Sequence, residues 1–175
     1  AAKDTGISLE GARGAIQGFG NVGANAARIG PGLFSCRVVA VSDSRGGIYS
    51  RNGLDIPALV AHKEKTGSVA DFPGAENITN DQLLELEVDI LIPAALENVI
   101  TLDNASRVKA RMIAEFANGP VSSDADALLH AKGVLILPDI LCNGGGVIVS
   151  YFEMVQNFNL DHWDAEVVNR RLEKK

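Results

Sequence analysis

A glycine-rich segment near the start of the chain, Gly18-Phe19-Gly20-Asn21-Val22-Gly23, is the feature that most restricts what this sequence can fold into. It follows an apolar run over residues 12–17 that is typical of a buried strand, and it precedes a helical pattern over residues 21–29. In such a turn the first glycine permits a sharp change of direction, the second lets a phosphate approach the backbone, and the third lets the helix pack against the strand. The order of strand, glycine turn and helix therefore predicts a βαβ unit that binds the pyrophosphate of a dinucleotide at the helix N-terminus.

An acidic residue follows the next predicted strand, which covers residues 37–41 and is rich in β-branched side chains. Asp43 lies about 20 residues after Gly23, which is the spacing at which an acid hydrogen-bonds the adenosine ribose. Its negative charge repels the 2′-phosphate of NADP and therefore favours NAD. Ser44 and Arg45 follow directly, and the guanidinium of Arg45 can pair with that phosphate, so the sequence leaves both dinucleotides open.

Strand-length apolar runs alternate with helical patterns over the remainder of the chain, which is typical of a parallel α/β sheet. Further strands are expected over residues 88–92, 111–115 and 134–137, and a short hairpin over residues 44–53. Gly30-Pro31-Gly32 is expected to end the first helix, and later helices are expected to begin at Asp55, Thr79, Ser122 or Ser123, Asn143 and Asp164. These patterns predict a Rossmann-type, doubly wound α/β fold, with a mostly parallel sheet and helices on both faces, in one domain over residues 1–175.

The composition argues against several other classes of function. A net charge of −6 is unfavourable for a nucleic-acid surface, and no apolar run reaches the ~18 residues of a membrane-spanning helix. The two cysteines, Cys36 and Cys142, are far apart, as is usual in a reducing compartment, so a cytoplasmic location is expected. The histidines at positions 62, 130 and 162 are scattered, and no metal site is expected from them.

Small and polar residues follow three other predicted strands, at the edge of the sheet where open α/β folds bind their ligands. The small side chains of Ala94 and Ala95 leave room for a flat ring. The amides of Asn118 and Asn143 can bond a carboxamide, although an Asn beside Gly is also ordinary turn chemistry. These loops are therefore candidates for the nicotinamide end of the same site.

Five segments, in order and at matching spacing, carry a more specific signal. They are Gln17-Gly18-Phe19-Gly20-Asn21-Val22-Gly23, Val41-Ser42-Asp43-Ser44, Ile92-Pro93-Ala94-Ala95-Leu96-Glu97, Ala117-Asn118-Gly119-Pro120 and Val149-Ser150-Tyr151-Phe152-Glu153. Together they resemble the coenzyme domain of the glutamate dehydrogenases, within the glutamate/leucine/phenylalanine/valine dehydrogenase family. The chain also opens without Met and stops inside a helical pattern, so we expect an excerpt of a longer enzyme whose N-terminal substrate domain is absent.

The resemblance implies a reaction and a set of contacts. L-glutamate would be converted to 2-oxoglutarate and ammonia with hydride passed to NAD or NADP, in a homo-oligomer that is usually a hexamer. The implied coenzyme contacts are Gly18, Phe19, Gly20, Asn21, Val22 and Gly23 at the pyrophosphate, Asp43 and Ser44 at the ribose, and Ala94, Ala95, Asn118 and Asn143 at the nicotinamide end. The family's catalytic Lys and Asp belong to the absent domain, so no catalytic residue is expected in this chain, which alone should be inactive.

The substrate side chain is assigned to Val147 and Ser150, which lie one helical turn apart. By resemblance they line the substrate pocket, where the Ser150 hydroxyl would donate to the γ-carboxylate of glutamate. The alternative for Ser150 is a hydroxyl that bonds its own helix backbone. Two other functions stay open: a leucine, phenylalanine or valine dehydrogenase, and a non-catalytic module that senses NAD(H).

The sequence departs from the family pattern at four positions. Phe116 replaces a glycine before Ala-Asn-Gly-Pro, Cys142 and Gly144 replace alanines, and Gly14 replaces a larger strand residue. A ring at position 116 is expected to narrow the nicotinamide end of the site or to shift its loop. The changes at Cys142 and Gly144 affect flexibility more than chemistry. Together the departures bear on the geometry of the nicotinamide end and not on the fold.

Overall fold

The computed structural model describes residues 6–175, which form a seven-stranded sheet in the order β4-β3-β2-β1-β5-β6-β7. The strands are β1 (Arg13–Gln17), β2 (Arg37–Asp43), β3 (Gly46–Tyr49), β4 (Glu76–Ile78), β5 (Ile90–Pro93), β6 (Met112–Ala114) and β7 (Leu135–Leu137). The five neighbouring strands β2, β1, β5, β6 and β7 run parallel to one another. β3 pairs antiparallel with both β2 and β4. The predicted mostly parallel sheet is confirmed.

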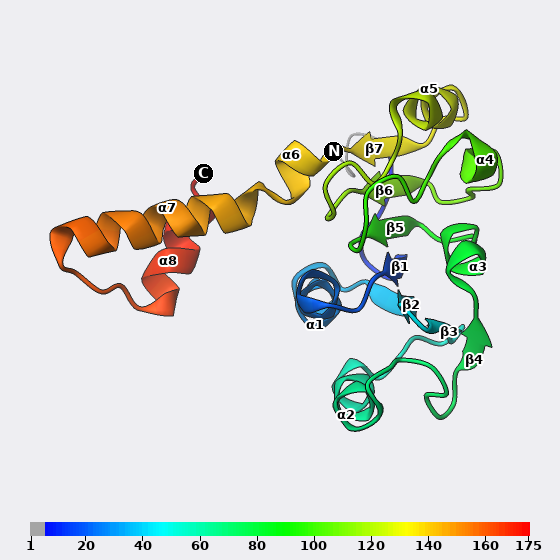
Figure 1. Cartoon of the computed structure of the whole chain (residues 1–175), viewed down its shortest axis with the longest axis horizontal. Coiled ribbons are helices and arrows are strands. Elements are labelled where there is room, and N and C mark those ends of the chain that lie inside the picture. The colour runs from blue at the N-terminus through cyan, green and yellow to red at the C-terminus, as the bar shows by residue number, and fades with distance from the viewer. Residues whose placement is uncertain (1–5) are drawn as a thin grey trace.

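Helices cover both faces of this sheet, as the doubly wound prediction requires (Figure 1). On one face lie α1 (Asn21–Phe34) and α2 (Ile56–Thr66). On the other lie α3 (Asn80–Leu84), α4 (Leu102–Ala105) and α5 (Ser123–Ala131). Because the central strands are covered on both sides, they are apolar along their length: Val38, Val39, Ala40 and Val41 of β2 are all buried.

Glycine in the first strand has a local explanation. The pairing of β1 with β2 shifts register between Gly14 and Ala15. A Cβ at Gly14 would lie 3.7 Å from the carbonyl oxygen of Arg37, which is ordinary contact, so close packing does not require the glycine. We interpret Gly14 as marking this irregularity in the ladder, a common place for glycine within a strand.

The predicted end of the first helix is wrong. α1 continues through Pro31 to Phe34 and ends at Ser35, whose φ of 53° is left-handed and whose N–H donates to the carbonyl of Pro31 at 3.0 Å. A proline within a helix lacks one N–H donor. Here that loss falls in the last turn, which is mostly exposed, so one further turn of helix is retained.

The other predicted helix starts are observed. The side chains of Asp55, Thr79 and Ser122 each accept a hydrogen bond from the first turn of their helices, and Thr79 forms a complete capping box with Gln82. Asp164 occupies the predicted N-cap position without a side-chain bond. The elements that the sequence did not predict are β4, α4 and α6 (Asp139–Cys142), which are too short to produce a periodic pattern.

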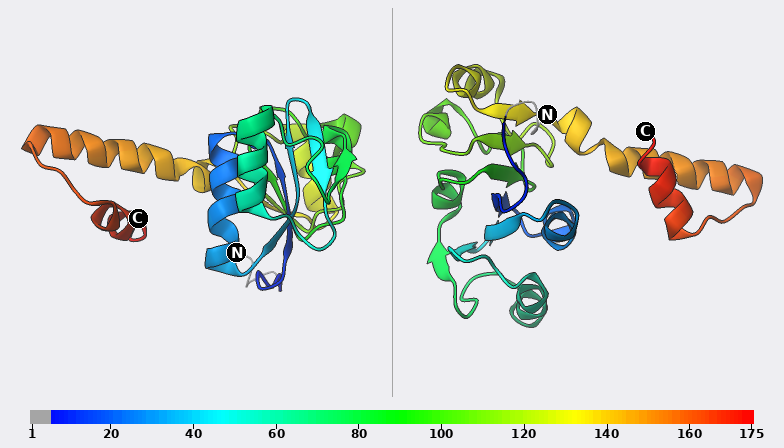
Figure 2. Two further views of the ribbon diagram at one scale, coloured as in Figure 1. Left: turned by 90° about the horizontal axis from the view of Figure 1, so that it is seen from below. Right: turned by 180° about the vertical axis from the view of Figure 1, so that it is seen from behind.

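The last two helices form an arm that projects from the sheet (Figures 1 and 2). It consists of α7 (Gly144–Asn159) and α8 (Ala165–Leu172), which pack on each other. Phe152 and Gln156 of α7 are buried, and the Phe152 ring lies 5.9 Å from the ring of Trp163. The opposite face of α7 carries exposed apolar side chains, which we call the α7 stripe: Val147, Tyr151, Met154 and Phe158.

Candidate dinucleotide site

The crevice expected of a doubly wound fold lies where the chain leaves two neighbouring parallel strands toward opposite faces of the sheet. Here that point is between β1 and β5, which run side by side. The Gly18 N–H donates to the carbonyl of Ser42 at 3.0 Å, and the Ala94 N–H donates to the carbonyl of Gln17 at 2.8 Å. The glycine loop after β1 therefore touches the ends of both β2 and β5. The structure brings together three of the segments that the sequence predicted to share a site.

Two of the three loop glycines are required by the fold itself. Gly18 has φ +95°, and a Cβ there would lie 2.7 Å from the Cβ of Ala95. A Cβ at Gly23 would lie only 1.8 Å from the carbonyl oxygen of Gly18. These contacts close the turn and seat α1 against β1, as the spacing predicted.

Gly20 differs from its two neighbours in the motif. Its φ of −85° suits any residue, and a Cβ there would meet nothing within 4 Å. Gly20 is exposed and occupies the N-cap of the 14-residue α1, where no side chain caps the free N–H groups. The fold therefore leaves open space at the one position where a phosphate would need to approach the backbone closely.

The other predicted pyrophosphate residues divide into two kinds. Asn21 and Val22 are exposed at the start of α1. Phe19 is 3% exposed, and its ring packs in the core with Ile16 and Val41. Phe19 therefore offers only its backbone to the crevice.

The carboxylate of Asp43, the predicted ribose ligand, already bonds to other groups of the chain. Its side chain is 8% exposed, and its carboxylate oxygens contact the N–H of Arg45 at 2.9 Å, the Oγ of Ser68 at 3.2 Å, the N–H of Val69 at 2.8 Å and the Nζ of Lys63 at 3.4 Å. Burial raises the pKa of Asp43, but these four partners together outweigh burial and keep its pKa below the ordinary value. Ser44 and Arg45 beside it are exposed.

Lys63 is a residue that the sequence interpretation missed, because Lys63-Glu64-Lys65 reads as a solvated charge run. Its Nζ donates to the carbonyl of Phe19 at 2.8 Å and lies 5.7 Å from the centre of the Phe19 ring. Together with the Asp43 contact, Lys63 joins the glycine loop to the end of β2. A signal was present: Lys63 follows the buried Leu59 by four residues and so shares its helix face.

The nicotinamide candidates also come together in part. Ala94 is half-buried and Ala95 exposed at the end of β5, and the N–H groups of Phe116 and Ala117 both donate to the carbonyl of Pro93. Beyond them, Asn143 Nδ2 donates to Asn118 Oδ1 at 2.7 Å. The two asparagines are therefore neighbours, as a shared role at the coenzyme would require.

The substrate candidates, Val147 and Ser150, lie on the arm, away from the glycine loop. Val147 is 75% exposed, and Ser150 lines a shallow hollow of about 480 Å³ with Glu153, Met154, Asn157 and Phe158. The alternative of a backbone-bonded serine is not observed. The α7 side chains that bond the helix backbone are those of Gln156 and Asn159.

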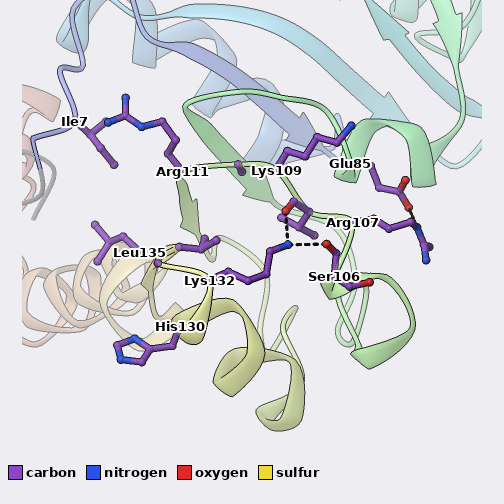
Figure 3. Close-up of a pocket in the computed structure, with 13 residues that line it drawn as sticks. Ile7, Glu85, Ser106, Arg107, Lys109, Arg111, His130, Lys132 and Leu135 are labelled. Carbon is purple, nitrogen blue, oxygen red and sulfur yellow. Dashed lines mark hydrogen bonds and ion pairs between the residues drawn. The ribbon is translucent and has the colours of Figure 1, made fainter.

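Another cavity, of about 870 Å³, lies at the opposite edge of the sheet, by the amino ends of β6 and β7 (Figure 3). It carries several cations, but three are already engaged. Lys132 Nζ donates to three carbonyls at and just after the end of α4, Arg107 pairs with Glu85, and Arg111 pairs with Asp89. The side chains of Lys109 and Arg111 extend in different directions. None of the predicted site residues lines this cavity.

Residues 6–175 contain two cysteines and no grouped metal ligands. Cys36 and Cys142 are free thiols. In this part of the chain no three or more His, Cys, Asp or Glu side chains are grouped as a metal site would need. None of its helices combines the length and the apolar character needed to cross a membrane.

Two curated relatives are glutamate dehydrogenases. The chain is 51% identical over 169 residues to "Glutamate dehydrogenase" of Thermotoga maritima, covering 97% of this chain and 41% of that protein. It is 49% identical over 172 residues to "NADP-specific glutamate dehydrogenase" of a Synechocystis strain, covering 92% of this chain and 40% of that protein. The chain thus spans about two fifths of the length of these relatives.

The fold is shared with a solved structure of the same kind. The hetero-hexameric glutamate dehydrogenase of Thermus thermophilus superposes with a TM-score of 0.91 at 39% identity, over 99% of this chain and 40% of that one. The family described as Glutamate/Leucine/Phenylalanine/Valine dehydrogenase matches the whole sequence, residues 1–175. The chain therefore belongs to the glutamate/leucine/phenylalanine/valine dehydrogenase family.

Proposed function

We propose that this chain is the coenzyme-binding domain of a glutamate dehydrogenase, which converts L-glutamate to 2-oxoglutarate and ammonia. The observation that carries the coenzyme part is Gly20, a glycine that the fold does not require, placed at an uncapped helix N-terminus in the crevice. The names of the two relatives support the choice of substrate.

The residues present fit a dinucleotide laid along the carboxyl ends of β1, β5 and β6. The pyrophosphate would sit over Gly20 and bond the N–H groups that open α1, where the positive end of the helix dipole also lies. The nicotinamide, which accepts the hydride, would lie toward Ala94, Asn118 and Asn143. We place no proton-transfer group in this chain, and the catalytic Lys and Asp are proposed to come from the part of the protein outside it.

The α7 stripe supports the proposal that the chain is one domain of a larger enzyme. Val147, Tyr151, Met154 and Phe158 follow one another at helical spacing on the face of α7 that turns away from α8. Contiguous exposed apolar surface of this kind usually marks an interface. We propose that the rest of the polypeptide covers this stripe, which would bring Ser150 to the substrate, and that the whole enzyme is a homo-oligomer, a hexamer by resemblance.

Replacing Ser150 with alanine in the full-length enzyme tests the substrate assignment. We expect kcat/KM for glutamate to fall by about 10- to 100-fold, because a hydroxyl bonded to a charged carboxylate contributes ~1.5–3 kcal/mol. The KM for coenzyme should not change. Ser123→Ala, an exposed serine at the start of α5, is the matched control. Unchanged glutamate kinetics in S150A would favour a leucine, phenylalanine or valine dehydrogenase, which assays with those amino acids would identify.

We infer that this chain discriminates only weakly between NAD and NADP, the two coenzymes of the family. Asp43 favours NAD by its charge, but that charge is paired with Lys63, and both of its oxygens already accept hydrogen bonds. Exposed Ser44 and Arg45 lie beside it and offer a hydroxyl and a guanidinium to a 2′-phosphate. We therefore propose NAD as the preferred coenzyme with NADP accepted.

Lys63→Met in the full-length enzyme is expected to lower the affinity for both NADH and NADPH by about tenfold. The methionine keeps apolar contact with the Phe19 ring but loses the hydrogen bond to the Phe19 carbonyl and the ion pair with Asp43. Together these two interactions stabilise the conformation of the glycine loop by ~1–2 kcal/mol. Calorimetric titrations with NADH and NADPH measure both affinities. Lys65→Met, an exposed lysine on the same helix, is the control. Equal affinities in the K63M and K65M variants would show that Lys63 does not support the loop.

A further inference from the structure

Three side-chain hydrogen bonds join two loops at the carboxyl ends of β6 and β7. The Glu115 carboxylate accepts from the N–H of Asp139 at 3.0 Å, and the Asp139 carboxylate accepts from the N–H of Gly119 at 2.9 Å. The third bond is the amide contact between Asn143 and Asn118. Every one of these bonds connects segment 115–119 with segment 139–143. The first two form a reciprocal pair, in which each acid holds a backbone N–H of the other loop.

Glu115 is not a residue that packing alone explains. It is 7% exposed, and burying a carboxyl group is unfavourable unless it is well bonded. Burial raises the pKa of Glu115, and the charges of Asp139 and Asp126 raise it further. The N–H groups of Asp139 and Val121 lower it by less, so its pKa lies above the ordinary value. An apolar side chain would avoid that penalty. The partner that the acid finds in the other loop is the N–H of Asp139, at the start of α6.

Few other contacts fix the loop that carries Asn143. α6 has only four residues, and the three glycines that follow it, Gly144, Gly145 and Gly146, would meet nothing within 4 Å even with a Cβ added. The first loop is held better, since the N–H groups of Phe116 and Ala117 are bonded to Pro93. Backbone bonds fix the base of this loop, since the Glu115 N–H donates to the carbonyl of Leu137 at 3.1 Å and the Asn143 N–H donates to the carbonyl of Asp139 at 2.8 Å. Between the loops themselves, the bonds that set Asn143 relative to Asn118 are those made by the carboxylates of Glu115 and Asp139.

We propose that Glu115 and Asp139 are positioning residues, which hold Asn118 and Asn143 in one geometry at the nicotinamide end of the coenzyme. Neither acid is proposed to touch the coenzyme, and neither takes part in proton transfer. The inference rests on the proposed function, because it takes Asn118 and Asn143 as nicotinamide contacts. On this proposal, Glu115 and Asp139 help to orient the nicotinamide ring and do not affect the binding of the adenosine and pyrophosphate.

The test compares NADH with ADP-ribose, which has the adenosine and the pyrophosphate but no nicotinamide. In the full-length enzyme, Glu115→Ala and Asp139→Ala should each weaken NADH binding by about tenfold and leave ADP-ribose binding within about twofold of the wild type. Glu115→Gln and Asp139→Asn retain an acceptor oxygen and should restore NADH binding to within about twofold. Glu87→Ala, an exposed acid at the amino end of β5, is the control for loss of charge.

The outcomes separate this inference from the function on which it rests. Equal losses of NADH and ADP-ribose in the alanine variants, or no loss of either, would overturn the positioning role. So would failure of the Gln and Asn variants to rescue binding, because that result assigns the effect to charge. If an alanine variant does not fold, the Gln and Asn variants decide alone, and tenfold weaker NADH binding in both would count against the proposal. A wild-type enzyme that binds neither ligand would instead overturn the proposed function.

Discussion

Gly23→Ala is expected to destabilise the domain by more than about 3 kcal/mol and to abolish coenzyme binding with it. The new Cβ would lie 1.8 Å from the carbonyl oxygen of Gly18, and this neighbour is backbone that cannot rotate away. Relief requires α1 to move off β1, which opens the turn between them. Thermal unfolding of the full-length protein and a titration with NADH measure the two effects.

Gly20→Ala is the informative partner of this substitution, because it should separate folding from binding. A Cβ at Gly20 meets nothing within 4 Å, so the melting temperature should stay close to that of the wild type. The methyl group would, however, occupy the space proposed for the pyrophosphate, and NADH affinity should fall by about 100-fold or more. Gly32→Ala, at an open position late in α1, is the control and should bind NADH normally. Normal NADH binding by the G20A variant would mean that the loop does not hold a phosphate.

Phe158→Asp in the full-length enzyme should lower kcat/KM for glutamate by about 100-fold or more. Phe158 is 81% exposed in this chain but is proposed to be covered by the rest of the polypeptide, where burial of its ring contributes ~3 kcal/mol and a buried carboxylate adds a further penalty. Steady-state kinetics and the oligomeric state by light scattering are the measurements.

Leu160→Asp is the control for Phe158→Asp. Leu160 is 96% exposed, has φ 51° at the end of α7, and lies outside the α7 stripe, so the same change of charge should have little effect there. If Phe158→Asp changes kcat/KM and the oligomeric state as little as Leu160→Asp does, the α7 stripe faces solvent in the complete enzyme. The proposal that another part of the protein packs on α7 would then be wrong.

Much of the fold was predictable from the sequence because its signals are local. The glycine spacing, the β-branched run of β2 and the caps at Asp55 and Thr79 each depend on a few neighbouring residues, and the structure confirms them. The end of α1 was not, since a proline stops a helix only when the lost hydrogen bond cannot be tolerated. The elements β4, α4 and α6 were not predicted, because three or four residues are too few to show a helical or strand periodicity.

The sequence identifies the strand ends that form the site, but it does not identify the side-chain contacts within it. The sequence identifies Asp43 as an acid at the ribose distance, yet its carboxylate is directed to donors on the α2–β4 connection, which lies more than twenty residues away. The run Lys63-Glu64-Lys65 by itself indicates a solvated face, whereas Lys63 bonds Phe19 and Asp43. The roles of Glu115 and Asp139 depend on a bond between residues 24 positions apart. Long-range partners of this kind follow from topology, which periodicity does not encode.

The arm acts as a lever because it leaves the sheet at a single place. A helix of 16 residues is about 24 Å long, so a rotation of about 10° at its start carries its far end through about 4 Å. That start is formed by Asn143 and the glycines after it, beside the bonds made by Asp139. A small change of angle at Asn143 would therefore become a displacement of several ångströms at the far end of α7, so the geometry of this one junction sets where Phe158 and the tip of the arm lie.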